Sequence, residues 1–282
     1  MTAEMNKNRL IYVYALVPSN EKGKIELENL MGIDGNSRIS HKEFDHITAV
    51  LCELDSNEFS IDSIEKNTQD PQWLTVKATH HHEIVNNLHK SCTVVPLKFC
   101  TIYSNETSLK QELQQNQEDI LKLFTRFENC DGWNVKIYCQ KETWLAFWEV
   151  HDRTVLKEKE KISQMSPGTQ FLMKKKLKQK LIHTVDSHIE KVIHQFHELL
   201  IKNSTQYTSK KIWNKQVTGK QEEMVWNGVY LVENNDDTLN EIKKVIKQFQ
   251  LNYEKQGLMI EITGPWPPYD FLDVEREGLK IG

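Results

Sequence analysis

The sequence predicts an α+β protein made of two domains, and three observations support this prediction. The chain has 282 residues, which is enough for two domains that each bury a core of their own. Short apolar or alternating runs, typical of strands, are separated by longer runs with helical spacing of the apolar residues. Strands and helices follow one another in a similar order in both halves. We therefore expect two modified ferredoxin-like modules, each a small, mainly antiparallel sheet with helices on one side.

The first half begins with two predicted strands. Residues 10–17 are rich in β-branched and aromatic side chains, and Pro18 ends the run. Both faces of this segment are largely apolar, which indicates a central strand that is covered on both sides. Residues 47–54 form a second buried run after a glycine-containing turn at 32–36. No helix follows that turn, and a phosphate loop needs the amides of a helix N-terminus, so nucleotide binding there is disfavoured.

A helix is expected from Asp70 to about Lys90, and it carries three consecutive histidines. Consecutive helical residues point about 100° apart, so His80, His81 and His82 cannot converge on one metal ion. His81 falls on the apolar side of this helix. We interpret it as a histidine at the edge of the core whose ring nitrogens are hydrogen-bonded, and the alternative is an acid–base or ligand role.

The rest of the first half combines an interrupted strand with a helix. Pro96 lies within the apolar run 92–103, which predicts an edge strand or two short strands joined by a bulge. An exposed edge near Pro96 and Phe99 is one candidate surface for a partner. Asn105 or Thr107 is suited to cap the next helix, whose apolar residues keep helical spacing.

Turn residues at 129–132 divide the chain into a first domain, 1–130, and a second domain, 131–282. The second domain opens with an alternating strand, 133–139, which is followed by a lysine-rich amphipathic stretch, 142–164. A Ser-Pro-Gly-Thr sequence then breaks the amphipathic pattern before the longest helix of the chain.

That long helix is expected over about 170–202. Its roughly 33 residues would reach about 50 Å at about 1.5 Å per residue, which exceeds the width of a small domain. Part of the helix must therefore project or bend. Its apolar stripe is a second candidate for contact with a partner. The candidate residues of this stripe are Val185, Ile189, Val192 and Phe196.

The same helix carries histidines and lysines that we expect on its polar face. His194 and His197 are one turn apart, but His183 is distant and no further ligand at suitable spacing completes a site. We therefore predict no metal and no cofactor. The lysine run 174–176, with Lys178 and Lys180 beyond it, is interpreted as a solvated helix face, and a nucleic-acid patch is the less favoured alternative.

The chain closes with a strand at 224–232, a helix at 239–253, a strand at 258–263 and a C-terminal tail, 264–282. Prolines in the tail fix φ and remove amide donors, so the sheet is expected to end there. Aromatic side chains between them make the segment too apolar for a solvated linker. It must dock, either on the protein's own sheet or on a partner. The candidate contact residues of the tail are Pro265, Trp266, Pro267, Pro268 and Tyr269.

Composition narrows the class of protein. The formal net charge of -4 argues against a nucleic-acid role, since nucleic-acid-binding domains usually present a strongly basic face. No apolar run is long enough to cross a membrane, and the N-terminus lacks the apolar core of a signal peptide, so a cytoplasmic location without membrane contact is expected. The 5 cysteines are odd in number and form no C-x-x-C pair, which fits reduced, buried thiols.

Four stretches of the chain resemble the GvpL/GvpF family of gas vesicle proteins, and they occur in the family's order along almost the whole sequence. The stretches are Tyr12-Val-Tyr-Ala-Leu-Val17, the block from His81 to Phe99 with its Val-Val-Pro-Leu-Lys-Phe end, Ser166-Pro-Gly168 with Phe171-Leu172, and Thr263-Gly-Pro-Trp-Pro-Pro-Tyr269. The last is the most specific. Lys98 and Cys100 depart from the family, which often has arginine and glycine there; Cys100 makes a tight turn after Phe99 less expected.

The resemblance implies a non-enzymatic accessory protein of gas vesicle formation. Family members are described as two-domain α+β proteins with ferredoxin-like modules. They act as minor shell components or assembly factors, together with the small hydrophobic shell protein and other accessory gas vesicle proteins. The expected locations are accordingly the gas vesicle and the cytoplasm.

The competing class is an enzyme that acts on a small molecule. Against it, the sequence contains no glycine-rich loop leading into a helix, no Gly-x-Ser-x-Gly and no His-Glu-x-x-His. The residues that would support it are His81 with Lys98 or Tyr269 as an acid–base pair on a ferredoxin-like sheet. A pocket lined by His81 would favour catalysis, whereas a filled core there would favour the assembly role.

Overall fold

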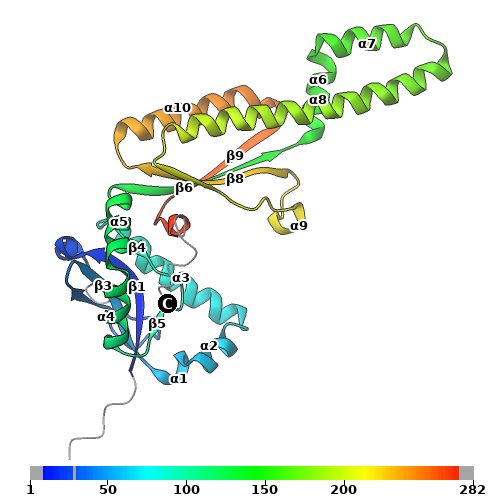
Figure 1. The fold of residues 1–282 in the computed structure, drawn as a ribbon. Coiled ribbons are helices and arrows are strands. Elements are labelled where there is room, and N and C mark those ends of the chain that lie inside the picture. The colour runs from blue at the N-terminus through cyan, green and yellow to red at the C-terminus, as the bar shows by residue number, and fades with distance from the viewer. Residues whose placement is uncertain (1–8, 28–29, 273–282) are drawn as a thin grey trace, which may run out of the picture. The chain divides into compact units, whose positions relative to one another are not determined.

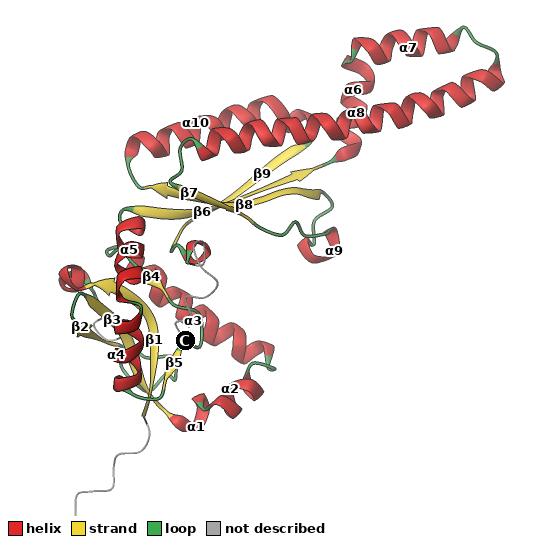
Figure 2. Ribbon diagram, viewed as in Figure 1, coloured by secondary structure: helices red, strands yellow, loops and turns green. Residues whose placement is uncertain are grey.

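The computed structural model describes residues 9–27 and 30–272, and they form two compact units (Figure 1). The first unit takes in the chain up to Gly132 and again from Pro265, and the second unit is Trp133–Gly264. Each unit contains one sheet with antiparallel strands and several helices (Figure 2), so the fold is α+β, as the sequence predicts. The ferredoxin-like form of the modules stays a prediction.

The C-terminal segment corrects the predicted domain boundaries. We expected the tail 264–282 to belong to the second domain, but the chain from Pro265 belongs to the first unit. The cause is aromatic packing, because the ring of Trp266 lies 5.3 Å from that of His82 in the first unit. Residues 273–282 of the predicted tail lie outside the described part of the chain.

The sheet of the first unit is built around the strand predicted to be central. Its order is β2-β3-β1-β4, and β5 also pairs with β1. The apolar run around Pro96 forms two short strands, β4 and β5, as one of the two alternatives predicted, but residues 97–101 separate them in place of the expected bulge. The strands are β1 (Arg9–Pro18), β2 (Ser40–Phe44), β3 (Ile47–Asp55), β4 (Val95–Pro96) and β5 (Ile102–Tyr103).

Two helices of the first unit begin at capping side chains, and one of them, Asn105, is a predicted cap. The Asp70 carboxylate accepts a hydrogen bond from the Gln72 amide at 2.9 Å, at the start of the histidine-bearing helix. Asn105 caps the next helix, but this helix ends at Gln115 and a second one begins at Gln117, where we expected one continuous helix. The helices are α1 (Ser56–Phe59), α2 (Ile61–Asn67), α3 (Pro71–His89), α4 (Glu106–Gln115) and α5 (Gln117–Phe127), with short 3-10 turns η1 (Ser19–Lys24) and η3 (Tyr269–Phe271).

The second unit has a four-stranded sheet in the order β7-β8-β6-β9. β9 is an edge strand, and it continues through Pro265 to Trp266, beyond its predicted end. Proline lacks the backbone N–H, but on the free side of an edge strand this loses no hydrogen bond between strands. β7 lies in a polar stretch for which no strand was predicted. The strands are β6 (Cys130–Cys139), β7 (Gln206–Ser209), β8 (Glu223–Glu233) and β9 (Leu258–Trp266).

Helices α8 and α10 pack on one face of this sheet (Figure 2). The predicted long helix is α8, and its first half extends past the sheet, where α6 and α7 pack against it (Figure 1). The amphipathic stretch before it divides into two helices at Asp152, whose carboxylate accepts from the Val155 amide at 2.8 Å. The helices are α6 (Lys141–His151), α7 (Arg153–Ser163), α8 (Pro167–Ile201), α9 (Lys215–Thr218) and α10 (Asp236–Tyr253), with the 3-10 turn η2 (Glu254–Gln256).

Candidate partner-binding surfaces

The proline-rich segment docks on its own unit. The rings of Trp266 and Tyr269 lie 5.3 and 6.0 Å from the ring of His82 on α3. Pro267 and Pro268 are buried, and Pro265 is exposed. The turn is closed by a 2.8 Å hydrogen bond from the Tyr269 amide to the carbonyl oxygen of Pro267. Most of this predicted contact surface is therefore occupied by the first unit itself, which is the first of the two alternatives that the sequence left open.

A glycine allows the chain to approach this turn closely. A Cβ atom at Gly132 would lie 3.1 Å from the carbonyl oxygen of Trp266, which is closer than an ordinary van der Waals contact. The backbone of the first unit is thus fitted to the docked segment on a second side.

The predicted edge at Pro96 and Phe99 is also largely covered. Pro96 is buried and pairs with Ala15 of β1. Phe99 is half-buried, and its ring lies 6.3 Å from that of Trp73 and 6.0 Å from that of His81. Pairing and ring packing leave little of this edge for a partner strand.

Cys100 adopts the tight turn that its identity made less expected. Its φ is +67°, in the left-handed region that favours glycine. Its amide donates to the hydroxyl of Tyr12 at 3.3 Å, and burial raises the pKa of its thiol to about 11. The surrounding contacts hold a non-glycine residue in a strained conformation.

His81 is the centre of a closed hydrogen-bond network. Its Nε2–H donates to the carbonyl oxygen of Leu97 at 3.0 Å, so its Nδ1 accepts from the hydroxyl of Tyr12 at 2.8 Å. The side chain is 3% exposed, and burial lowers its pKa to about 4. The prediction of a core histidine with hydrogen-bonded nitrogens is confirmed.

This geometry does not suit the acid–base role considered above. Both ring nitrogens are already bonded, and neither is directed at solvent. The hydroxyl of Tyr12 is likewise occupied, and burial raises its pKa. A proton acceptor for a substrate needs a free nitrogen within hydrogen-bond reach of it, and His81 offers none.

A second buried histidine lies in the second unit, and its predicted position is wrong. His197 was expected on the polar face of α8, but it is 7% exposed and its Nδ1 shares a 2.7 Å hydrogen bond with the hydroxyl of Tyr230. The sheet accounts for this, because the aromatic side chains of Tyr207 and Trp226 lie beside the imidazole. His194 stays exposed. Within the described residues, no group of three potential ligands could hold a metal ion.

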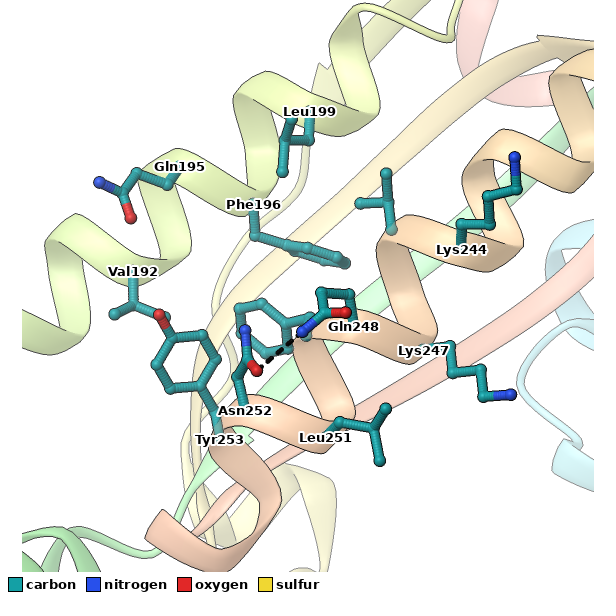
Figure 3. A pocket seen from close by; sticks show the side chains of 12 residues that line it. Val192, Gln195, Phe196, Leu199, Lys244, Lys247, Gln248, Leu251, Asn252 and Tyr253 are labelled. Carbon is teal, nitrogen blue, oxygen red and sulfur yellow. Dashed lines mark hydrogen bonds between the residues drawn. The ribbon is translucent and has the colours of Figure 1, made fainter.

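The four candidate residues in the apolar stripe of α8 fall into two groups. Val185 and Ile189 lie in the core of the second unit, with 0% and 6% exposure. The structure therefore places these two residues away from any surface. Val192 and Phe196 are also buried, but they form the floor of an open groove between α8 and α10 (Figure 3).

This α8–α10 groove has a volume of about 660 Å³. Its floor contains Phe196, whose ring lies 4.3 Å from that of Phe249. Two apolar side chains at its borders are well exposed, Leu199 at 45% and Leu251 at 68%. The polar side chains of Gln195, Gln248 and Asn252 line it as well. Lys244 and Lys247 also line it (Figure 3). Such a groove suits an apolar partner, because it offers unsatisfied apolar surface and no constellation of catalytic groups.

The sequence did not indicate this groove. The apolar spacing places Leu199 in the stripe of the long helix and Leu251 among the apolar residues of the helix 239–253, and neither pattern brings the two together. The signal that was available is that α8 and α10 both continue their apolar stripes to the helix end, so that two apolar faces meet over one sheet. Only the packing of the two helices shows which residues remain uncovered.

Together these features define an α+β protein of two units that offers an open apolar surface and a filled core around its buried histidine. Within the described residues, no helix combines the length and apolar character that crossing a membrane requires. The family model for "Gas vesicle synthesis protein GvpL/GvpF" matches residues 10–273. The chain therefore belongs to the GvpL/GvpF family of gas vesicle proteins, which confirms the resemblance.

Relatives and solved structures agree with this assignment. Gas vesicle protein L of a Streptomyces species is 19% identical over 273 residues, which are 97% of this chain and 96% of that protein. Gas vesicle protein L of Haloferax mediterranei is 22% identical over 73% of this chain and 64% of that protein. The crystal structure of GvpF from an Anabaena species has a TM-score of 0.66 at 15% identity and covers 95% of this chain and 100% of that one. GvpF from Microcystis aeruginosa has a TM-score of 0.60 at 15% identity, covering 93% of this chain and 98% of that one.

Proposed function

We propose that this protein is a non-enzymatic accessory protein of gas vesicle formation that holds the small hydrophobic shell protein at the α8–α10 groove. The observation that carries the proposal is the exposed apolar border of the groove, Leu199 and Leu251, in a chain whose family assignment covers residues 10–273. The protein acts as an assembly factor or as a minor component of the shell, and other accessory gas vesicle proteins are its further partners.

The physical argument starts from the partner. A shell protein that lines a gas-filled space is apolar, so its free form must be kept from aggregating. An open groove with an aromatic floor buries apolar side chains of the partner, which contributes about 25 cal/mol per Å² of apolar surface removed from water. The lysines beside the groove keep its surroundings solvated, so that the complex stays dispersed.

The proposal also includes a location. A protein that binds the shell protein is expected on the gas vesicle when it remains in the shell, and in the cytoplasm when it delivers shell protein and leaves. Both expectations follow from the same groove, because its exposed apolar residues can bind the shell protein in a transient complex as well as in a permanent one.

The experiment is capture of the co-expressed shell protein by the full chain and by a variant that carries Leu199→Glu and Leu251→Glu. We expect the double variant to lose capture by more than about tenfold, because carboxylates at the border of an apolar interface must be desolvated. Both positions are solvent-exposed, so the fold is expected to tolerate the change.

The matched control is Val76→Glu on α3 of the first unit, where the side chain is 59% exposed. This variant is expected to capture the shell protein as the original chain does. Undiminished capture by the double variant would refute the groove as the binding site. Equal loss in the control would also refute it, because the effect would then come from added charge alone.

A further inference from the structure

The hairpin formed by α7 and the first half of α8 has an unusual distribution of charge. From Lys161 to Val185 the sequence contains lysines but no aspartate or glutamate. The whole chain, in contrast, has a formal net charge of -4. The hairpin is thus a local basic surface on an acidic protein.

The lysines of α8 in this region are not neutralised by neighbours. Within the described residues, Lys174, Lys175, Lys176, Lys178 and Lys180 have no carboxylate within 4.0 Å, and all of them are exposed. Two lysines of α7 in the same hairpin are paired, Lys159 with Glu149 at 3.3 Å and Lys161 with Glu158 at 3.7 Å.

A second groove lies between α7 and α8, with a volume of about 360 Å³. Its inner residues are apolar and buried, with Val155 at 8%, Ile162 at 1% and Leu181 at 3% exposure. Lys174 and Lys178 line the same groove, together with Glu149 of α6 and Lys159, which form an ion pair at 3.3 Å. An apolar floor therefore lies directly beside Lys174 and Lys178, which form no ion pair with any residue that the structure describes.

The two helices that form this α7–α8 groove carry further exposed apolar side chains. Phe171 is 71% exposed and Leu172 is 65% exposed, and both lie in the opening turns of α8. Leu156 on α7 is 45% exposed. Exposed apolar side chains of this size at both helices are typical of a surface that another molecule covers.

We propose that the α7–α8 groove binds an acidic amphipathic helix of a partner protein. The apolar face of such a helix fits the floor between Val155 and Leu181, and its carboxylates meet Lys174 and Lys178. Complementary charge then sets the orientation and the rate of association. This surface is separate from the α8–α10 groove, so the inference does not depend on binding of the shell protein.

The shape of the groove favours a helix over a lipid surface. A bilayer presents a flat interface, whereas the apolar floor here is recessed between two helices and its residues are almost fully buried. A side-chain ridge of a third helix reaches such a floor in the way that helices pack on one another. Binding of single-stranded nucleic acid uses several aromatic side chains along a basic groove, on which the bases stack. None of the described residues that line the α7–α8 groove is aromatic.

The test uses a fluorescent synthetic peptide of about 18 residues, roughly five helical turns, with leucines on one face and glutamates beside them. Its binding to the full chain is measured by fluorescence anisotropy. We expect saturable binding that weakens as salt increases, because exposed charges are screened. A peptide with glutamine in place of glutamate is expected to bind at least about tenfold more weakly.

Charge reversal identifies the site. The variant with Lys174→Glu and Lys178→Glu is expected to lose about tenfold or more in affinity for the acidic peptide. The matched control carries Lys243→Glu and Lys255→Glu, which make the same change of charge at exposed positions outside the hairpin. Its affinity is expected to stay within about twofold, apart from the general effect of net charge.

Three results would overturn the inference. One is equal loss of peptide affinity in both double variants, and another is no saturable binding by the original chain. The third concerns vesicles that contain anionic phosphatidylserine. If the original chain binds them, the peptide does not displace them, and the Lys174→Glu, Lys178→Glu variant no longer binds them, the hairpin is a lipid-binding surface. Because the shell protein is absent from this assay, its outcome is independent of the proposed function.

Discussion

The first unit is closed around its histidine-bearing helix, whereas the second unit leaves apolar surface open beside its long helix. In the first unit, both nitrogens of His81 are bonded and Trp266 packs beside His82. In the second unit, α8 and α10 cover one sheet face but leave Leu199 and Leu251 exposed. In the first unit, the chain's own C-terminal segment covers apolar surface beside a helix, whereas in the second unit such surface stays exposed.

The largest effect is expected for the floor of the α8–α10 groove. Phe196→Ala should lower the free energy of unfolding by about 3–5 kcal/mol, because it leaves a cavity where a 2% exposed ring was packed. Leu251→Ala, at the 68% exposed border, should change it by less than about 0.5 kcal/mol. Urea unfolding followed by circular dichroism measures both. Equal effects of the two substitutions would show that the border is as well packed as the floor, and the groove would not be open.

The second effect concerns the closed unit and pH. Burial lowers the pKa of His81 from its ordinary 6.5 to about 4, so below about pH 6.5 the unfolded chain binds more protons than the folded chain. The contribution of His81 to the free energy of unfolding is therefore fully present above pH 6.5 and is lost as the pH falls toward 4. The loss amounts to about 3 kcal/mol, at roughly 1.4 kcal/mol per pKa unit. Urea unfolding at a series of pH values measures this loss.

Two variants isolate the contribution of His81. His81→Gln removes the titrating group, so its stability should depend less on pH in this range, although it is lower at pH 7. His183→Gln changes an exposed histidine and should leave the pH profile as it was. A pH profile of His81→Gln as steep as that of the original chain would contradict the closed network.

The third effect concerns the docked C-terminal segment. Trp266→Ala should destabilise the first unit by about 2 kcal/mol, less than a fully buried tryptophan would, because this ring is half-buried. Pro265→Ala changes an exposed neighbour and serves as the control. Hydrogen exchange of α3 amides is the measurement, and it should accelerate only in the tryptophan variant. Unchanged hydrogen exchange in that variant would mean that the C-terminal segment does not stabilise α3.

The smallest effect is expected at Cys100. Cys100→Gly relieves a left-handed conformation that costs a non-glycine residue about 1–2 kcal/mol. The greater freedom of glycine in the unfolded chain offsets about 0.5–1 kcal/mol of this gain, so a net stabilisation of about 0.5 kcal/mol is expected. Cys100→Ala keeps the strain and should not stabilise. Thermal unfolding of the two variants side by side decides between relief of strain and loss of the thiol.

Local rules in the sequence were sufficient for much of the first unit. Proline removes an amide donor wherever it stands, so the division of the run around Pro96 into short strands was predictable. Helical geometry likewise put His81 on the apolar side of its helix. The break between α4 and α5 at Asn116 was missed, because the apolar spacing continues across it.

Other features depend on contacts between segments that are distant in sequence. The side of α8 that carries His197 faces aromatic residues of β7 and β8, and the spacing within α8 does not reveal them. Val185 and Ile189 were candidates for a partner surface because a stripe on one helix cannot show whether the sheet or another protein covers it. Leu199 and Leu251 line one groove although they belong to different helices.

The most direct test of the α8–α10 groove as the shell-binding site is site-specific photo-cross-linking in cells that form gas vesicles. A photoreactive amino acid is placed at Leu251 in the groove or, for comparison, at Val76 on α3. We expect a covalent adduct with the shell protein from position 251 and none from position 76. Functional gas vesicles without an adduct from position 251, or with an equal adduct from position 76, would contradict it.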